Sequence, residues 1–103
     1  MKNILIFILV LIFSFDLFAQ TQQNRNLMFD GQNREYVIYI PAMYDGTQNM
    51  PLMFSFHGGG GTSTGFMNFE NDMRPISDTA GFIAIYPQAA VDPTDGSNSW
   101  LHK

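Results

Sequence analysis

Four consecutive glycines, Gly58–Gly61, constrain this chain more than any other feature of its sequence. They follow His57 and a short apolar run, residues 52–56, which reads LMFSF. An almost continuously apolar run of this length is typical of a strand that is buried on both faces. Glycine loses more backbone freedom on folding than any other residue, so four of them at the end of a strand need a physical reason.

Three explanations account for such a run. The first is a phosphate-binding loop, because glycine-rich loops at helix N-termini bind anions. However, no Lys-Ser or Lys-Thr pair follows Gly61, and Phe66 stands where a dinucleotide-binding loop would need its last glycine. The second explanation is structural, a tight turn from strand to helix, and it stays open as an alternative.

The third explanation is an oxyanion hole. Acyl transfer creates negative charge on a carbonyl oxygen, and backbone N–H groups aimed at that oxygen stabilise the transition state. Glycine lets the backbone come close to a bulky ester because it has no side chain. Ligands of α/β sheets bind at the carboxyl ends of the strands, which is where Gly58–Gly61 would lie. We therefore expect an oxyanion-binding loop at this point of the chain.

The flanking sequence predicts an α/β fold. Residues 26–30 and 34–40 are expected to form an antiparallel β-hairpin around the turn dipeptide Asp30-Gly31. Residues 82–86 read FIAIY and predict a second buried strand, parallel to residues 52–56 and joined to them by a helical segment. An N-terminal β-hairpin followed by a βαβ unit is thus the predicted architecture.

The helical segment is expected to consist of two short pieces. Thr62, Ser63 and Thr64 are plausible N-caps, Pro75 would break or restart the helix, and Gly81 is well placed to end it. Residues 91–103 contain several turn dipeptides and predict an irregular loop. The acidic residues of the helical segment are expected to be solvated helix charges: Glu70, Asp72 and Asp78.

The N-terminus has the composition of a secretory signal peptide. Lys2 supplies a positive charge, residues 4–15 are apolar except for Ser14, and Ala19 offers a small residue before a cleavage site. An uncleaved membrane anchor is the alternative, but the run is shorter than the roughly 20 residues that cross a bilayer. We expect an extracellular or periplasmic protein that is divided into a signal peptide (1–19), a flexible mature N-terminus (20–25) and a catalytic portion (26–103).

Charge and cysteine content narrow the range of partners. The net charge is −4 at pH 7 and the basic residues are scattered, which argues against a nucleic-acid partner. The chain has no cysteine, so it can form neither a disulfide framework nor a thiolate metal site. We expect no metal, no other cofactor and, once the signal peptide is removed, no contact with a membrane.

The predicted strand over residues 52–56 has no later strand that could pair with its second edge. Unprotected apolar edges promote aggregation. A hairpin and two parallel strands are also too little to close an α/β domain. We therefore expect these residues to be the N-terminal part of a larger protein, with an incomplete fold.

Several motifs occur in a specific order over about residues 34–100. They are REY at 34–36, YIP at 39–41, PL at 51–52, HGGG at 57–60, AGFIAIYP at 80–87 and Trp100. This ordered set resembles the polyhydroxybutyrate depolymerase and feruloyl esterase group of secreted esterases. A His-Gly-Gly-Gly segment after a strand is also similar to the oxyanion loop of the α/β-hydrolase fold. The resemblance implies the N-terminal portion of that fold.

The resemblance also implies roles for individual residues. Gly58 and Gly59 would be the oxyanion-hole amides of the loop, with Gly60 close behind. His57 would have a structural role, because in this fold the catalytic histidine follows the nucleophile and the acid along the chain. Trp100 would be a weak candidate for substrate contact, with a buried packing role as the alternative.

The implied function is that of a serine carboxylic-ester hydrolase acting on polyhydroxyalkanoates or on feruloyl or acetyl esters of plant polysaccharide. No serine of the mature chain stands in a Gly-x-Ser-x-Gly motif, so the triad of Ser, Asp and His is expected to lie beyond Lys103. The chain alone should then be inactive. The alternatives are a serine peptidase of the same fold, a non-catalytic secreted binding module of hydrolase type, and a truncated remnant.

Overall fold

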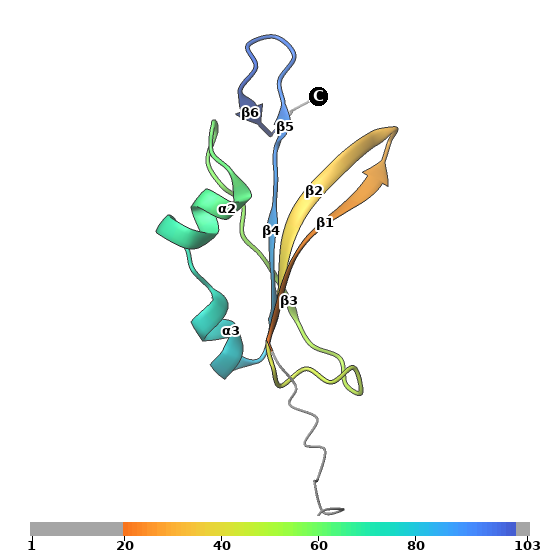
Figure 1. Cartoon of the computed structure of the whole chain (residues 1–103), viewed down its shortest axis with the longest axis vertical. Coiled ribbons are helices and arrows are strands. Elements are labelled where there is room, and N and C mark those ends of the chain that lie inside the picture. The colour runs from red at the N-terminus through yellow and green to blue at the C-terminus, as the bar shows by residue number, and fades with distance from the viewer. Residues whose placement is uncertain (1–19, 101–103) are drawn as a thin grey trace, which may run out of the picture.

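The computed structural model describes residues 20–100. The predicted signal peptide, residues 1–19, and the last three residues, 101–103, lie outside the described residues. Figure 1 shows the described elements, which follow in this order: β1 (Thr21–Phe29), β2 (Gln32–Ile40), β3 (Leu52–Phe54), α2 (Ser63–Gly65), the π-helical turn η1 (Phe66–Glu70), α3 (Arg74–Ala80), β4 (Ile83–Pro87), β5 (Ala90–Val91) and β6 (Asn98–Ser99).

Strands β1 and β2 form a long antiparallel hairpin that begins with Thr21 opposite Ile40. The two turn residues, Asp30 and Gly31, have φ angles of 51° and 70°. Positive φ at both positions is the requirement of a type I′ turn, which matches the right-handed twist of the two strands. The hairpin is confirmed, but β1 starts earlier than residue 26. This differs from the flexible terminus that the sequence predicts for residues 20–25.

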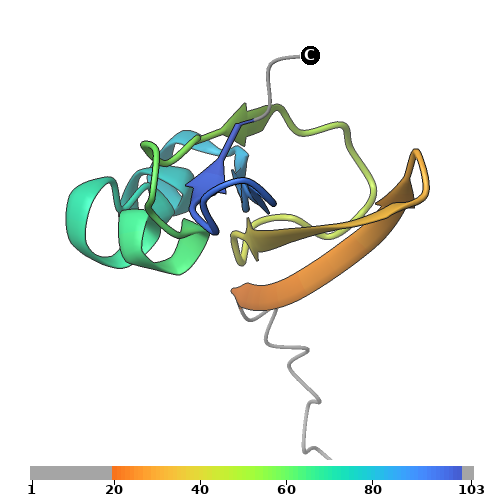
Figure 2. The ribbon, with the colours of Figure 1, turned by 90° about the horizontal axis from the view of Figure 1, so that it is seen from above.

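The main sheet has four strands in the order β1-β2-β4-β3. Strand β2 pairs antiparallel with both β1 and β4, whereas β3 pairs parallel with β4. Helices α2 and α3 lie on the same side of this sheet (Figures 1 and 2). The two ends of the sheet order, β1 and β3, are therefore its edge strands.

The core lies between this sheet and the helical segment. Val37 and Tyr39 from β2 and Ala84 and Tyr86 from β4 form one buried cluster with Met67 of η1. All five side chains are at most 4% exposed. The four strand residues of this cluster alternate with residues that face the other side of the sheet, as the two-residue period of a strand requires. Burial of these apolar surfaces is the main term that favours folding.

The helical segment consists of two short pieces, as the sequence predicts. Thr62 caps α2, because its hydroxyl accepts the N–H of Gly65 at 3.0 Å. Pro75 lies in the first turn of α3, where its missing N–H costs no hydrogen bond. Gly81 ends α3 in the left-handed conformation, with φ 79° and ψ 61°.

The predicted fold class, α/β, is wrong for the part of the chain that the structure describes. Strands make up 37% of these residues, the helices are short, and the two sheets are mixed and antiparallel. The cause is pairing that the sequence pattern does not reveal, since β2 also joins the sheet next to β4. The expectation of an N-terminal portion of an α/β-hydrolase fold is corrected with it. Two local predictions remain correct, namely the hairpin and the parallel pairing of β3 with β4.

Strand β3 is far more exposed than the sequence predicts. Leu52 and Phe54 are 54% and 51% exposed, and Met53, which points to the opposite face, is 40% exposed. No described strand pairs with the outer edge of β3. The sequence predicts that residues 52–56 are buried on both faces. Within residues 20–100 this prediction is wrong, because four of the five side chains are exposed.

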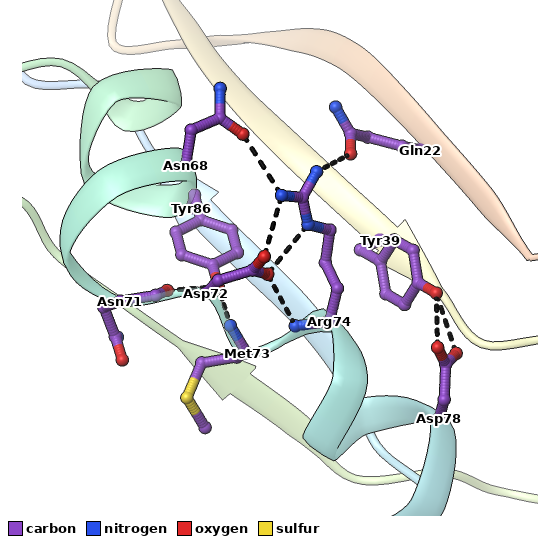
Figure 3. A network of polar contacts seen from close by, with 9 residues as sticks. All are labelled: Gln22, Tyr39, Asn68, Asn71, Asp72, Met73, Arg74, Asp78 and Tyr86. Carbon is purple, nitrogen blue, oxygen red and sulfur yellow. Dashed lines mark hydrogen bonds and ion pairs between the residues drawn. The ribbon is translucent and has the colours of Figure 1, made fainter.

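A polar network joins the helices to the hairpin (Figure 3). The hydroxyl of Tyr39 donates to the carboxylate of Asp78, with oxygen–oxygen distances of 2.7 and 2.9 Å. Burial, reinforced by the hydrogen bond to Asp78, raises the pKa of Tyr39 to about 12. Asp78 is therefore not simply a solvated helix charge, because it fixes α3 against β2.

Arg74 is the second centre of this network. Its guanidinium donates to Asp72 at 2.8 Å, to Gln22 of β1 at 2.8 Å and to Asn68 of η1 at 3.2 Å (Figure 3). The hydrogen bond from Arg74 lowers the pKa of Asp72 below its usual range. Asp72 too was expected to be merely solvated, whereas it orients the side chain that connects three elements.

The network predicts a specific effect of Tyr39→Phe. Losing the hydroxyl leaves the carboxylate of Asp78 without this donor, so the free energy of unfolding should fall by about 1 kcal/mol. A pKa raised from 10.0 to about 12 gives stability that is complete below pH 10 and is lost as the pH rises to about 12. Urea denaturation of the purified chain between pH 7 and pH 12 measures both effects.

Tyr36→Phe is the matched control, because no described residue forms a hydrogen bond with the hydroxyl of Tyr36. We expect it to leave the free energy of unfolding at pH 7 nearly unchanged. Equal stability of Tyr39→Phe and the wild type at pH 7, with the same loss above pH 10, would contradict this role of the Tyr39 hydroxyl.

Candidate functional site

The glycine loop lies where β3 and β4 end. The two strands are parallel, so their carboxyl ends meet at one edge of the sheet. The backbone pairing continues past β3, because the N–H of Ser55 donates to the carbonyl of Ile85 at 2.9 Å. His57 and Gly58–Gly61 follow at that edge, and the chain then enters α2.

The fold itself accounts for two of the four glycines: the backbone conformation requires glycine at Gly60, and close packing favours it at Gly61. The N–H of Gly61 donates to the carbonyl of Gly58 at 3.1 Å, which closes a four-residue turn. Gly60, the third residue of this turn, has a φ of 78°, a backbone conformation that residues other than glycine rarely adopt. A Cβ on Gly61 would lie 3.2 Å from the carbonyl oxygen of Gly58. The turn therefore explains Gly60 and Gly61.

The fold does not require the other two glycines. A Cβ on Gly58 or on Gly59 would meet no atom within 4 Å, and neither residue has a positive φ. No group within residues 20–100 accepts a hydrogen bond from either N–H. Gly60, by contrast, donates its N–H to the carbonyl of Asn98 at 2.7 Å. Of the three predicted oxyanion-hole donors, Gly58 and Gly59 thus carry free amides and Gly60 does not.

His57 is buried, with 3% of its surface exposed, and its ring bonds to backbone groups. Nε2 accepts the N–H of Ala89 at 3.0 Å, so Nε2 carries no proton in this arrangement. Nδ1 then carries the proton and donates to the carbonyl of Gly58 at 2.7 Å. The ring therefore connects the glycine loop to the segment that follows β4. Within residues 20–100 no serine hydroxyl contacts it.

Gln88 is a site residue that the sequence analysis did not identify. Its side-chain oxygen accepts the N–H of Ser63 at 2.8 Å, at the start of α2. Its amide nitrogen lies 3.3 Å from Nε2 of His57. The position directly after β4 is the only signal in the sequence that could have pointed to it, because strand ends gather at this edge of the sheet.

The hairpin β5–β6 is a second feature that the sequence analysis missed. Residues 91–103 were predicted to be irregular, but Val91 pairs with Asn98 and Ala90 with Ser99. Besides accepting from Gly60, Asn98 donates its side-chain amide to the carbonyl of Gly61 at 2.9 Å. The hairpin therefore holds the C-terminal half of the glycine loop.

Trp100 lies against the glycine loop. Its indole N–H donates to the carbonyl of His57 at 2.7 Å. Its ring lies 4.9 Å from the ring of His57 and 5.2 Å from that of Phe56, edge to face in the second case. Trp100 also lines an open apolar hollow of about 640 Å³, together with Phe54 and Ile85. Both roles considered for Trp100, packing and substrate contact, remain predictions.

Within residues 20–100, no group of three or more His, Asp or Glu side chains could hold a metal ion. No helix in that range is long and apolar enough to cross a membrane. The hydroxyl of Ser55 accepts from Asn71 at 3.2 Å, and no His, Asp or Glu of the described residues forms a hydrogen bond with it. The nucleophile, acid and base that the resemblance implies are predicted to lie beyond Lys103, outside the described residues.

No family model matches the chain, and no curated protein does. Among solved structures, the chain is similar to vibralactone cyclase. The match has a TM-score of 0.54 and 22% sequence identity, and it covers 90% of this chain and 27% of the cyclase chain. At this identity the likeness is one of fold alone, and it does not bear on the resemblance to esterases. This chain spans well under half of the cyclase that it matches.

The different demands on the four glycines predict different effects of substitution. Gly60→Ala should lower the free energy of unfolding by about 1–2 kcal/mol, because alanine must adopt the left-handed conformation. Gly58→Ala should change it by less than about 0.5 kcal/mol, because the new Cβ meets no atom. Thermal and urea denaturation of both variants measures the difference. Equal losses in the two variants would contradict this assignment of the turn.

Proposed function

We propose that His57–Gly61 is the oxyanion-binding loop of a secreted serine carboxylic-ester hydrolase, similar to polyhydroxybutyrate depolymerases and to feruloyl or acetyl xylan esterases. One observation carries the proposal. Gly58 and Gly59 are consecutive, have free amides, and are not required to be glycine by any contact or φ angle of the described fold. Glycine at both positions is explained by an occupant that needs close access to the backbone.

The chemistry of the loop suits a developing oxyanion. Two backbone N–H groups are the usual donors to the tetrahedral intermediate of acyl transfer, and removal of one donor costs about 3–4 kcal/mol of barrier. Along the chain no acidic residue occurs between Asp45 and Glu70, so no carboxylate close in sequence repels a negative charge at the loop. A phosphate-binding loop would need a lysine directly after its glycines, and Thr62 stands there instead.

The substrate class rests on the sequence motifs and on the surroundings of the loop. Phe56 and Trp100 place aromatic surface next to His57, which suits the apolar part of an ester. The ordered motifs over about residues 34–100 favour polyhydroxyalkanoates or feruloyl and acetyl esters of plant polysaccharide as substrates. The attacking serine and its partners would come from polypeptide outside these 103 residues, and secretion would follow from the signal peptide expected over residues 1–19.

Anion binding at the two free amides tests the proposal directly. The purified chain, labelled with ¹⁵N-glycine, is titrated with methylphosphonate, a tetrahedral anion that resembles the charged intermediate. The N–H signals of Gly58 and Gly59 should move downfield together and saturate, because the anion accepts both hydrogen bonds. The signals of Gly31 and Gly46, two turn glycines elsewhere in the chain, are the internal controls. Movement of all glycine signals alike, or of none, would contradict the proposal.

The chain alone should not turn over an ester. Wild-type protein incubated with p-nitrophenyl acetate should release p-nitrophenol at the rate of buffer, without a burst, because no described serine hydroxyl forms a hydrogen bond with a histidine. Mass spectrometry after treatment with a fluorophosphonate should find no labelled serine. A burst with stoichiometric labelling of one serine would place the nucleophile inside these residues and overturn this part of the proposal.

A further inference from the structure

The glycine loop is held by a segment that lies almost forty positions further along the chain. Three hydrogen bonds make the connection: Gly60 N–H to the Asn98 carbonyl at 2.7 Å, the Asn98 side-chain amide to the Gly61 carbonyl at 2.9 Å, and the Trp100 indole N–H to the His57 carbonyl at 2.7 Å. Asn98 therefore contacts two consecutive residues of the loop, one through its backbone and one through its side chain.

Such bonds matter more here than in an ordinary loop. Four successive glycines have no side chains to pack, and their backbone can populate more conformations than that of any other sequence. The turn bond from Gly61 to Gly58 is local and leaves the position of the loop relative to the sheet open. The ring of His57 fixes the first half of the loop. Among residues 20–100, only Asn98 forms hydrogen bonds that fix Gly60 and Gly61 to a different element.

Asn98 is itself held in place by the hairpin. It pairs with Val91 across β5 and β6. The connecting turn is closed by the N–H of Asp92, which donates to the carbonyl of Ser97 at 2.7 Å. Asp95 accepts the N–H and the hydroxyl of Ser97 at 2.9 and 2.7 Å. These bonds close the turn of the hairpin and hold Asn98 at a defined place opposite Val91.

We propose that Asn98 is a positioning residue, with Trp100 as a second anchor, that holds the amides of Gly58 and Gly59 ready for an oxyanion. This inference rests on the proposed function for the identity of the ligand. Catalysis by backbone donors depends on their being fixed before the reaction, because reorganisation during the reaction would cost part of their benefit. The side-chain amide of Asn98 supplies that order without touching the substrate.

Two variants remove the side-chain contact. Asn98→Ala deletes it, and Asn98→Leu keeps a side chain of similar size without a donor and without a new charge. In both, the ¹H–¹⁵N heteronuclear NOE of Gly58 and Gly59 should fall well below that of β4, whereas in the wild type it should match β4. The affinity of methylphosphonate should fall roughly tenfold, the change expected for the loss of about one hydrogen bond.

Ser97→Ala is the matched control. It lies next to Asn98 in the same hairpin and loses a hydroxyl contact to Asp95, but it does not contact the loop. We expect it to keep the NOE of Gly58 and Gly59 and the affinity for methylphosphonate, even where its melting temperature falls as much as that of Asn98→Leu. Trp100→Phe, which keeps an aromatic ring but loses the donor to His57, should give an intermediate loss of affinity.

The outcomes separate this inference from the proposed function. If the NOE values and the affinity of Asn98→Ala and Asn98→Leu equal those of the wild type, the positioning role is wrong, whatever the loop binds. If Ser97→Ala loses as much as they do, the effect is one of hairpin stability, and the positioning role is again wrong. If the wild type binds no methylphosphonate while its loop loses order only in the Asn98 variants, the proposed function fails and the positioning of the loop stands.

Discussion

The hydrogen bonds that fix the glycine loop, His57–Gly61, to distant segments are the constraint on which the candidate site depends. The His57 ring bonds the loop to Ala89 after β4, and Asn98 bonds it to the β5–β6 hairpin. Each bond offsets part of the entropy that a glycine-rich segment loses when it is ordered. What remains after these bonds are made is a pair of adjacent amides, Gly58 and Gly59, without an acceptor in the described residues.

Local signals predicted much of the secondary structure. The Asp30-Gly31 turn, the Thr62 cap and the Gly81 stop each depend on a few neighbouring residues, so a sequence can reveal them. The parallel pairing of β3 with β4 followed from two apolar runs joined by a helical segment. The fold class did not follow, because the placement of β2 beside β4 depends on pairing between distant strands.

The candidate site was predicted only in part, for the same reason. The run of glycines marks the loop, but nothing in a single sequence says which of its amides are already bonded. Gly60 is engaged by Asn98, a residue that the sequence placed in an irregular loop. Asp78 likewise looked like a solvated helix charge, because its partner Tyr39 lies in another element. Gln88 carried no local signal beyond its position at a strand end.

Hydrogen exchange at the four loop glycines measures most directly whether the loop is ordered yet leaves two amides free. We expect slow exchange at Gly60 and Gly61, which donate to Asn98 and Gly58, and fast exchange at Gly58 and Gly59. The four residues are identical, so a difference between the two pairs reports their different hydrogen bonding and not their composition. Equal exchange rates at all four glycines, or slow exchange at Gly58 and Gly59, would contradict this arrangement of the loop.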